Sequence, residues 1–473
     1  MHKLTNEDIP EYAQIAIDVL DKAGYVGWLV GGWVRDSLRG VPCHDIDMTS
    51  AALWQTTAKI FRDQGYMVHE TGTKHGTVTV VIKGHPIEIT TFRTESGYTD
   101  CRHPDKVEFV DTIEQDLARR DFTVNAMAYN PKFGLKDPYG GVEDLEAKII
   151  RCVGDPYIRF QEDALRILRA IRFSSRMDFS LETKTAQALS ELASSLEHVA
   201  DERIGQELRG ILKSGKMGQA MRCEPEVMCY AIPELGALRG FDQKSIYHRF
   251  DIYDHTASVC DGVEVYSGGS APEYLRWAAL FHDIGKPYCF TQDDKGAGHF
   301  YTHPHISGKM AKKIMGRMAI PKQIILDCFG VIVEHDVPIA PTEKSMLKML
   351  GRLDKYKVSS TQGVAYAALV IRQADAYGKA AQYWDYAKEL CQCQRCLDKV
   401  VADKGAFGIS DLYIKGGDII RLKKVEPGQI IGEILQSCLN GVVNGDIDQT
   451  KDAQFKWLED LDLKSLDSSC KTK

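Results

Sequence analysis

One short stretch, "LVGGWVRDSLRGVPCHDIDMTSA" at residues 29–51, strongly constrains the fold of the N-terminal part. The apolar run at residues 28–30 predicts a buried strand, and "WVRDSL" predicts the first turns of a helix. Gly31 and Gly32 predict a tight turn between them. Backbone N–H groups at such a turn suit an anionic group, and Arg35 offers a guanidinium fork to the same phosphate. The stretch therefore predicts a strand, turn and helix unit that binds a phosphate.

Two aspartates follow in the same stretch, on either side of Ile46. If "DIDM" is a strand, Asp45 and Asp47 lie on one face, roughly 6.6 Å apart along the chain. Two hard oxygen ligands so placed can hold a pair of Mg²⁺ ions. Glu88 in "PIEITTFR" is either a third such carboxylate or a solvent-facing strand residue. Each piece alone is typical of a turn or a solvated strand end. Their order is the one that a nucleotidyl transferase needs, because it holds a triphosphate beside two metal ions.

Composition limits the class of protein and its surroundings. The chain has 473 residues, enough for about three domains, and its 44% hydrophobic and 26% charged content is that of an ordinary soluble protein. The polar start and the lack of a long apolar run disfavour secretion and membrane spanning, so no membrane partner is expected. Thirteen scattered cysteines indicate reduced thiols and a cytoplasmic location. The net charge of −7 does not identify a partner, and the sequence does not specify an oligomeric state.

The secondary-structure pattern predicted by the sequence changes near residue 154. Before it, β-branched strand-like segments such as "GTVTVVIKG" and "HPIEITTFR" alternate with amphipathic helices, whereas helical periodicity dominates afterwards. We therefore expect an α+β protein, in which an N-terminal head with a small mixed β-sheet is followed by helical parts. The expected division is a head at 1–153 and helical parts at 154–240, 241–385 and 386–473.

The segment "ARRDFTVNAMAYN" at residues 118–130 carries groups suited to a nucleotide. Arg119 and Arg120 offer forks for phosphates. Asp121 and Asn125 are four residues apart, so on a helix they share a face and suit a pair of ribose hydroxyls. The alternative is an exposed charged turn.

The segment "EDALR" places Asp163 three residues before Arg166, and the two are neighbours if the segment is helical. An exposed ion pair is the ordinary meaning of this spacing. If the pair faces a nucleobase, Asp163 accepts a hydrogen bond and Arg166 donates one. Cytosine and adenine both present an amino donor beside a ring-nitrogen acceptor, whereas uracil and guanine present a carbonyl beside an N–H. Such a pair would therefore accept C and A and reject U and G.

Six ordered segments resemble the motifs of the class II tRNA nucleotidyltransferases, the CCA-adding enzymes and their bacterial poly(A) polymerase relatives, across residues 25–212. They are "LVGGWVRDSLRG…HDIDMTSA", "TFRTESGYTDCRHPDKVEFV", "DLARRDFTVNAMAYNP", "DPYGGVEDLEAKIIRCVGDP", "FQEDALRILRAIRF" and "DERIGQEL". The resemblance implies a head, neck, body and tail, with Asp45 and Asp47 as catalytic Mg²⁺ ligands. It implies that the nucleotide is bound by Gly31, Gly32, Arg35, Arg120, Asp121, Asn125, Asp163, Arg166 and Arg169.

The resemblance also implies substrates. The expected activity is addition of CMP and AMP from CTP and ATP to the 3′ end of tRNA, and "FGISDLYIKGGDIIRLKK" resembles the start of the tail that would grip the tRNA. The segment "TESGYTDCRHPDKVEF" corresponds to a loop that relatives adding only CC tend to lack, which favours complete CCA addition. The alternatives are a poly(A) polymerase or a CC- or A-adding enzyme. An alternative of a different class is a metal-dependent phosphohydrolase with a non-catalytic RNA-binding head.

A second constellation resembles the HD phosphohydrolase superfamily, with "HDIGK" as its sharpest motif. An adjacent His-Asp pair inside an apolar helix is costly to bury without a metal or another partner. The resemblance implies a metal site in the 241–385 part, formed by His255, His282, Asp283 and Asp375, with His305 and His335 matching the extra ligands of two-metal HD proteins. Imidazole and carboxylate ligands suit Mn, Fe, Co, Ni or Zn. Lys286, one turn beyond Asp283, could steady a phosphate.

A cysteine cluster, "CQCQRC", raises the question of a zinc site at Cys391, Cys393 and Cys396. Nothing nearby supplies a matching second pair, and the flanking residues continue a helix. We therefore expect thiols on a helix and no zinc.

Overall fold

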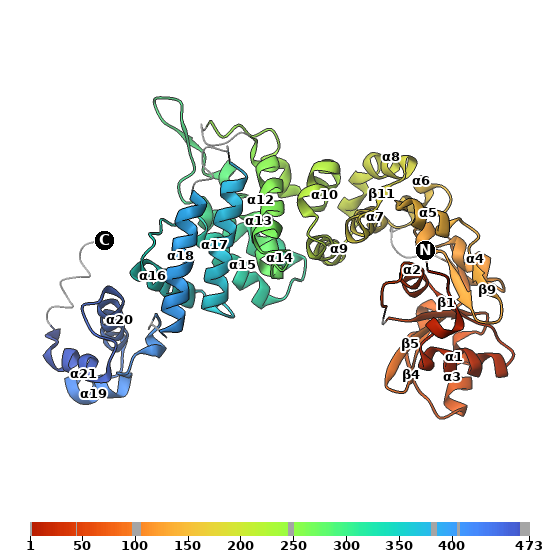
Figure 1. Ribbon diagram of the computed structural model, residues 1–473, viewed down its shortest axis with the longest axis horizontal. Coiled ribbons are helices and arrows are strands. Elements are labelled where there is room, and N and C mark those ends of the chain that lie inside the picture. The colour runs from red at the N-terminus through yellow and green to blue at the C-terminus, as the bar shows by residue number, and fades with distance from the viewer. Residues whose placement is uncertain are drawn as a thin grey trace. The chain divides into compact units, whose positions relative to one another are not determined.

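The computed structural model describes residues 2–43, 45–96, 106–244, 250–379, 386–403 and 407–463. The chain forms two compact units. Unit 1 is Met1–Ser214 with Glu224–Ala231, and unit 2 is Gly215–Cys223 with Ile232–Lys473. Unit 1 contains a β-sheet followed by helices and unit 2 is almost wholly helical, which confirms the predicted α+β class (Figure 1). The division into four parts is finer than these two units and stays a prediction.

A seven-stranded sheet forms the head, in the order β3-β4-β5-β2-β1-β8-β9. Only the β2–β5 pair is parallel within it, so the sheet is mixed, as predicted. The strands are β1 Gly27–Val30, β2 Asp47–Ser50, β3 Met67–Gly72, β4 Thr77–Ile82, β5 His85–Thr91, β8 Ala128–Asn130 and β9 Gly134–Lys136. A separate hairpin pairs β6 Arg93–Ser96 with β7 Lys106–Phe109. The predicted loop, residues 94–109, includes most of this hairpin, and its residues 97–105 fall outside the described residues.

Alternating burial explains how the sheet is covered. Strand β4 lies in the segment whose β-branched residues predict a strand, and every second residue of it is buried. Helices α1 and α3 pack on this part of the sheet. A separate cluster that includes Trp28 and Phe92 packs with Leu117 of α4. The helices and 3₁₀ turns of the head are η1 Asn6–Asp8, α1 Glu11–Lys22, α2 Gly32–Leu38, α3 Trp54–Asp63, η2 Thr73–His75, α4 Ile113–Ala118, η3 Thr123–Asn125 and α5 Gly141–Ala147.

The remainder of unit 1 is helical, apart from a two-stranded parallel ladder between β10 Ile149–Ile150 and β11 Ser180–Leu181. The side chain of Asp155 accepts a hydrogen bond from the Tyr157 amide and so caps the first helix, with proline at its first position. The helices and 3₁₀ turn are α6 Pro156–Glu162, α7 Leu165–Met177, α8 Thr183–Glu191, η4 Ala193–His198, α9 Asp201–Lys213 and α11 Pro225–Ala231.

Unit 2 begins with helices that pack around α12 and α17 and ends with a small helical cluster whose core includes Ile434 and Leu458. Its helices are α10 Met217–Cys223, α12 Ile252–Tyr266, α13 Glu273–Phe281, α14 His303–Arg317, α15 Lys322–Glu334, α16 Glu343–Lys355, α17 Thr361–Tyr377, α18 Tyr386–Ala402, α19 Gly416–Lys423, α20 Gln429–Asn444 and α21 Lys451–Asp460. Its short elements are η5 Pro233–Leu238, η6 Lys286–Tyr288, β12 Thr291–Gln292, β13 Gly298–His299 and η8 Ile409–Asp411.

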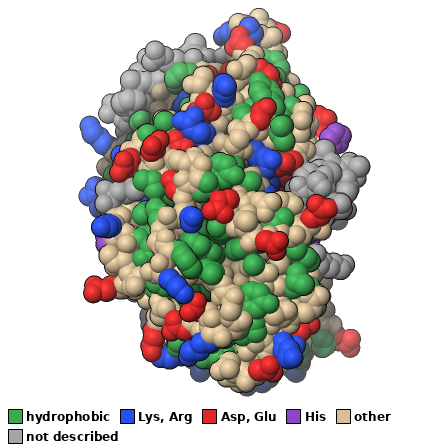
Figure 2. All heavy atoms as spheres, turned by 90° about the vertical axis from the view of Figure 1, so that its right-hand side faces the viewer, with side chains coloured by type: hydrophobic (Ala, Val, Ile, Leu, Met, Phe, Trp, Pro, Cys, Tyr) green, Lys and Arg blue, Asp and Glu red, His purple; other side chains and the backbone are tan. Residues whose placement is uncertain are grey.

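The surface carries mixed side chains. On the face shown in Figure 2, hydrophobic side chains lie among charged ones of both signs. Of the helices in the described part of the chain, none has the length and apolar content needed to cross a membrane.

Candidate nucleotide-binding site and metal centre

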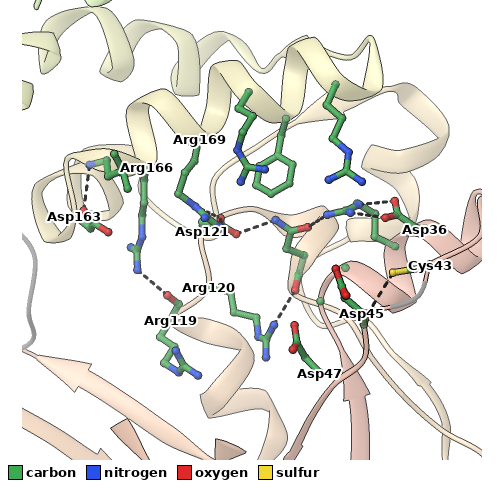
Figure 3. A pocket seen from close by; sticks show the side chains of 18 of the residues that line it. Asp36, Cys43, Asp45, Asp47, Arg119, Arg120, Asp121, Asp163, Arg166 and Arg169 are labelled. Carbon is green, nitrogen blue, oxygen red and sulfur yellow. Dashed lines mark hydrogen bonds and ion pairs between the residues drawn. The ribbon is translucent and has the colours of Figure 1, made fainter. Parts of the chain in front are cut away.

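A cavity of about 510 Å³ in unit 1 gathers the site residues expected in the head and neck. All eleven of those listed above line it, from the glycine pair to Arg169, although the sequence spreads them over more than a hundred positions (Figure 3). The remaining lining residues are Asp36, Cys43, Arg119, Leu165, Arg172, Phe173, Arg176 and Arg203.

Asp45 and Asp47 line the cavity, whereas Glu88 is exposed on the neighbouring strand and does not line it. Asp47 is the first residue of β2 and lies opposite Glu88 of β5 in the parallel pair, while Asp45 lies two residues earlier. Desolvation and then the charge of Glu88 raise the pKa of Asp47, against the opposing effect of Arg120. Oxygen ligands whose negative charge is only partly compensated are a donor set that fits Mg²⁺.

The glycine turn brings an arginine close to the backbone. Gly31 has a φ of 65°, and a Cβ at this position would lie 3.1 Å from Nη1 of Arg120. Glycine is therefore favoured by its backbone conformation, and a larger residue would also crowd Arg120. The Nε of Arg120 is buried and makes no hydrogen bond within the described residues. A donor without a partner in this position fits an anionic ligand such as a phosphate.

A chain of hydrogen bonds links the head to α7. Nη1 of Arg35 donates to Oδ1 of Asn125 at 2.6 Å, and Nδ2 of Asn125 donates to Oδ1 of Asp121 at 3.0 Å. Arg169 completes the chain with two donors to Oδ2 of Asp121 at 2.6 and 3.0 Å. Burial opposes ionisation, but Arg169 and Asn125 overcome it and lower the pKa of Asp121 to about 2. The chain therefore fixes an ionised carboxylate within the cavity.

Two local expectations about these residues were wrong. Asp121 and Asn125 do not share the face of an α-helix, because Asn125 ends a 3₁₀ turn that begins at Thr123. Arg35 does not hold its fork free for a phosphate, since Nε and Nη2 donate to Asp36 at 2.9 and 2.7 Å. Arg35 thus organises the chain of hydrogen bonds.

Asp163 and Arg166 both line the cavity but do not form the expected pair on one helix. Asp163 follows the end of α6 in an extended conformation and pairs with Arg203 of α9 at 2.8 Å. Arg166 lies on α7 and pairs with Glu162 at 2.6 Å. A simple helix ion pair is therefore excluded as the reason for the "EDALR" spacing.

Three residues that our sequence interpretation missed are Arg172, Phe173 and Arg203. Arg172 follows Arg166 and Arg169 at three-residue intervals in "LRILRAIRF", a spacing that places arginines close together along one side of a helix and could have identified it. Phe173 had no comparable signal, because a buried aromatic residue next to an arginine is ordinary in a helix. Arg203 owes its place to tertiary packing of α9 on α7.

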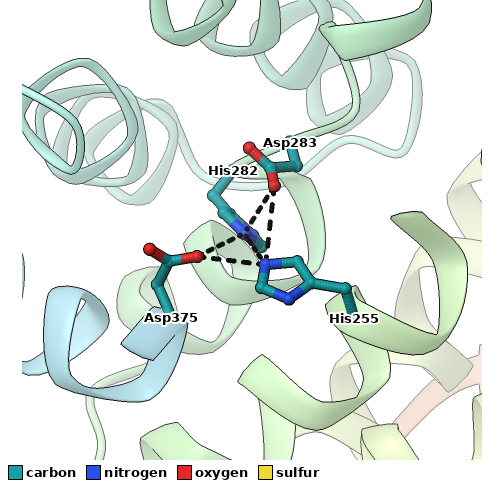
Figure 4. A group of neighbouring side chains, drawn as sticks. All are labelled: His255, His282, Asp283 and Asp375. Carbon is teal, nitrogen blue, oxygen red and sulfur yellow. Dashed lines mark hydrogen bonds and ion pairs between the residues drawn. The ribbon is translucent and has the colours of Figure 1, made fainter. Parts of the chain in front are cut away.

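A second cluster lies in unit 2 at the ends of three helices. His255 of α12, Asp375 of α17 and the pair His282 and Asp283 converge there (Figure 4). Nε2 of His255 is 3.0 Å from Oδ1 of Asp375 and 3.4 Å from Nε2 of His282. His282 and Asp283 follow α13, which ends at Phe281, so the expectation that they lie inside a helix was wrong.

Asp283 also belongs to a second group, with His303 and His335. Its Oδ1 lies 3.2 Å from Nε2 of His303 and 3.7 Å from Nε2 of His335. The expectation for His335 agrees with this arrangement. His305 is exposed and lies outside the group, so the structure does not support it as a ligand and places His303 there instead.

The hydrogen bonds of the histidines test whether these groups fit a metal. The Nδ1 atoms of all four rings lie 2.6–3.2 Å from backbone carbonyl oxygens, which only accept hydrogen bonds. In the neutral form of each ring, Nδ1 therefore carries the proton and Nε2 turns a lone pair toward the centre of the cluster. Metal-binding histidines are typically oriented in this way. The donor set fits one or two divalent cations, and the residues that would hold them are His255, His282, Asp283, Asp375, His303 and His335.

Two lysines border this cluster. The buried Nζ of Lys286 lies 2.7 Å from Oδ2 of Asp283 and 3.0 Å from the side-chain oxygen of Gln243. Lys379, which we did not predict, forms an ion pair with Asp375. Burial alone would raise the pKa of Asp283, but His282 and Lys286 hold it well below its usual range. The carboxylate is therefore ionised and available to a cation.

The cysteine cluster contains no such group. Cys391, Cys393 and Cys396 lie along α18 as free thiols, with Cys391 exposed and Cys393 buried. None of the three joins a metal-type group in the part of the chain that the structure describes.

Four known family models match the chain in succession. Residues 27–151 match the "Poly A polymerase head domain", and residues 178–229 match the "RNA and SrmB- binding site of polymerase A". Residues 246–380 match the "HD domain", and residues 342–458 match "tRNA nucleotidyltransferase domain 2".

Two curated relatives match almost the whole chain, and a third matches about half of it. The CCA-adding enzyme of Leuconostoc mesenteroides is 30% identical over 448 residues, covering 95% of this chain and 96% of the relative. The enzyme of the same name from Streptococcus mutans is also 30% identical over 448 residues, covering 94% and 96%. That of Ligilactobacillus salivarius is 42% identical over 257 residues, covering 54% of this chain and 63% of the relative.

Solved structures agree in fold. The Bacillus stearothermophilus CCA-adding enzyme in complex with CTP has a TM-score of 0.70 at 26% identity and covers 98% of this chain and 99% of its own. A Thermotoga maritima CCA-adding enzyme complexed with tRNA shares the fold, with a TM-score of 0.56 at 22% identity and coverage of 98% and 96%. A mixed sheet that carries paired carboxylates beside an arginine-rich cavity is that of a nucleotidyltransferase. The chain belongs to the family of CCA-adding enzymes.

Proposed function

We propose that this protein adds C, C and A to the 3′ end of tRNA, with CTP and ATP as substrates. One observation carries the proposal: a single cavity brings the carboxylates Asp45 and Asp47 together with Asp163 and Arg166. The first pair is suited to metal-dependent phosphoryl chemistry, and the second pair is suited to reading a base.

The residues divide the work by position. Asp45 and Asp47 would hold Mg²⁺, which when bound lowers the charge of the triphosphate and favours attack of the tRNA 3′ hydroxyl on the α-phosphate. The arginines of the cavity hold the nucleotide in line for that attack. At the other end, Asp163 accepts a hydrogen bond from the exocyclic amino group of C or A, and Arg166 donates one to the ring nitrogen. Pyrophosphate is the leaving group.

Complete CCA addition is favoured over poly(A) or partial addition, because the relatives that match nearly the whole chain are named CCA-adding enzymes. The test offers the protein tRNAs that end before the first C, after C and after CC, with each labelled NTP separately. CTP should extend the first two and ATP only the third. Repeated AMP addition would instead identify a poly(A) polymerase, and extension of only one class of end would identify a partial enzyme.

The proposal also covers the role of the C-terminal helices and the cellular location of the protein. We expect α19, α20 and α21 to contact the tRNA, since residues 342–458 match a tRNA nucleotidyltransferase domain. A cytoplasmic location is supported by the eleven cysteines in the described residues, all of which are free. Both expectations are open to direct tests, by crosslinking to tRNA and by cell fractionation.

A second function, metal-dependent phosphoester hydrolysis, is favoured by the cluster in unit 2. The observation behind it is that four Nε2 atoms face two carboxylates around the shared Asp283. Mn, Ni, Co or Fe bound there would supply an activated water, and Lys286 would steady a phosphate beside Asp283. The decisive comparison sets the protein against Asp283→Ala, with a generic phosphodiester and with RNA bearing a 2′,3′-cyclic end, across Mn, Ni, Co and Mg. Equal and chelator-insensitive background in both proteins would remove this function, while CCA addition should persist in the variant.

A further inference from the structure

The ring of Phe173 lies at the centre of a group of guanidinium groups. Arg172 lies over the ring at 4.4 Å from its centroid, Arg35 at 5.3 Å and Arg169 at 5.5 Å. The ring is only 5% exposed, and an edge contact with Phe122 at 5.7 Å fixes its plane. Among the residues that line the cavity, all of which lie in the described part of the chain, Phe173 is the single aromatic one.

These arginines come from two elements that the ring joins. Arg35 belongs to α2 on the sheet side of the cavity, whereas Arg169 and Arg172 belong to α7. Three cations around one ring repel each other, and the negative face of an aromatic ring offsets part of that repulsion. A leucine in place of the ring would fill much of the space but would not attract the guanidinium groups.

The side chain of Arg172 is fixed by contacts with α9 and with the ring of Phe173. Its Nε donates to Glu207 of α9 at 2.5 Å, and a Cβ at Gly210 would lie only 2.3 Å from its Cδ. The glycine therefore leaves room for the stem of Arg172 between α7 and α9. The two Nη groups make no hydrogen bond within the described residues, so they are available to a ligand in the cavity that they line.

We propose that Phe173 is a positioning residue for the polyphosphate part of the nucleotide. Its ring holds the guanidinium group of Arg172 in place, so that its two Nη groups can meet the triphosphate whichever base the nucleotide carries. Arg35 and Arg169 lie on the same ring but remain bonded to carboxylates and so fix the ring's surroundings. The inference rests on the proposed nucleotidyl transfer and adds the element that sets affinity for the phosphates independently of the base.

The test replaces the ring and uses a matched control in the same unit. Phe173→Leu removes the ring, and Phe173→Met fills a similar volume with a flexible chain. Phe179→Leu is the control, because Phe179 is 7% exposed and carries Arg39 over its ring at 5.5 Å but does not line the cavity. The readouts are KM and kcat for CTP and for ATP, and calorimetric binding of Mg²⁺-tripolyphosphate, which has no base.

We expect both Phe173 variants to raise KM for CTP and ATP by the same factor, roughly fivefold to twentyfold, and to weaken tripolyphosphate binding by a similar factor. The kcat values and the preference for CTP and ATP over UTP and GTP should stay within about twofold. Phe179→Leu should leave KM and tripolyphosphate binding unchanged, whatever it does to thermal stability.

Three results would overturn the inference: unchanged tripolyphosphate binding in folded Phe173 variants, a KM change for one nucleotide only, or equal effects of Phe179→Leu. If the parent protein adds nothing to tRNA, the proposed function fails, and the tripolyphosphate comparison still decides the role of Phe173. A parent protein that binds no tripolyphosphate would overturn the inference as well.

Discussion

His303 and His335 face each other with their Nε2 atoms 3.3 Å apart. Each ring places its Nδ1 beside a backbone carbonyl oxygen, so neither Nε2 carries the proton of a neutral imidazole. Two lone pairs at this distance repel unless a cation lies between or beside them. Burial is the main cause that lowers the pKa of His335, which favours the neutral ring and hence a metal over a proton.

This arrangement predicts which histidine of "HPH" matters for metal content. His303→Ala should lose about one bound divalent ion per chain relative to the parent protein, because one ligand of the second group is gone. His305→Ala is the matched control, since His305 is exposed two residues away and should retain the parent content. Elemental analysis after dialysis against Mn²⁺ measures both. Equal loss in the two variants, or no loss in either, would contradict the assignment.

The carboxylate at the start of β2 should be needed for chemistry more than for docking. We expect Asp47→Ala to lower nucleotide addition by at least about a thousandfold, because the metal ions can no longer be held at the α-phosphate. tRNA affinity, measured by filter binding, should change less than about threefold. Asp63→Ala, at the exposed end of α3, controls for the loss of a carboxylate in the same unit. Addition near the parent rate in Asp47→Ala would refute the metal assignment.

Arg166 should control which base is accepted. Without its donor, the ring nitrogen of C or A goes unpaired, so Arg166→Ala should lower the preference for CTP and ATP over UTP and GTP by about tenfold or more. Arg159→Ala is a close control, because Arg159 also pairs with Glu162, at 2.8 Å, but does not line the cavity. Incorporation of the four NTPs one at a time measures the preference. Unchanged ratios in Arg166→Ala would reduce its role to structural packing.

The ionised Asp121 predicts a pH dependence of stability. Its pKa is lowered from 3.8 to about 2 in the folded protein, so its contribution is present above pH 3.8 and is lost as the pH falls through about 2. The shift corresponds to roughly 2 kcal/mol. Asp121→Asn should therefore unfold more easily than the parent in urea at pH 7, and the gap should narrow between pH 4 and pH 2. A gap that stays constant down to pH 2 would show that the cost comes from packing and not from charge.

The sequence predicted the sheet because its pattern is local. Strand β4 consists only of threonine, valine and isoleucine, and such β-branched residues favour a strand without reference to the rest of the chain. The pairing of Asp47 with Glu88 was left open, because it depends on a parallel crossover between strands that are distant in the chain.

The errors concern places where helices begin and end. A sequence predicts the start of a helix only to within a residue or two. Side chains two residues apart on a helix point in directions that differ by about 200°. The start of α14 at His303 therefore decides that His303, and not His305, faces Asp283. Asp163 was placed on a helix for the same reason, although the chain leaves α6 at that residue. Arg203 could not be identified, because its partner lies 40 positions away.

Strand β2 is the fourth of the seven strands, hydrogen-bonded to β1 on one side and to β5 on the other. Its backbone amides should exchange with deuterium more slowly than those of the short connection between α6 and α7. One end of the site would then keep a constant geometry, while the other end adjusts between the smaller outline of a pyrimidine and the larger outline of a purine. In this way the protein, which uses no nucleic-acid template, would change the base it accepts without moving the carboxylates at the reacting phosphate.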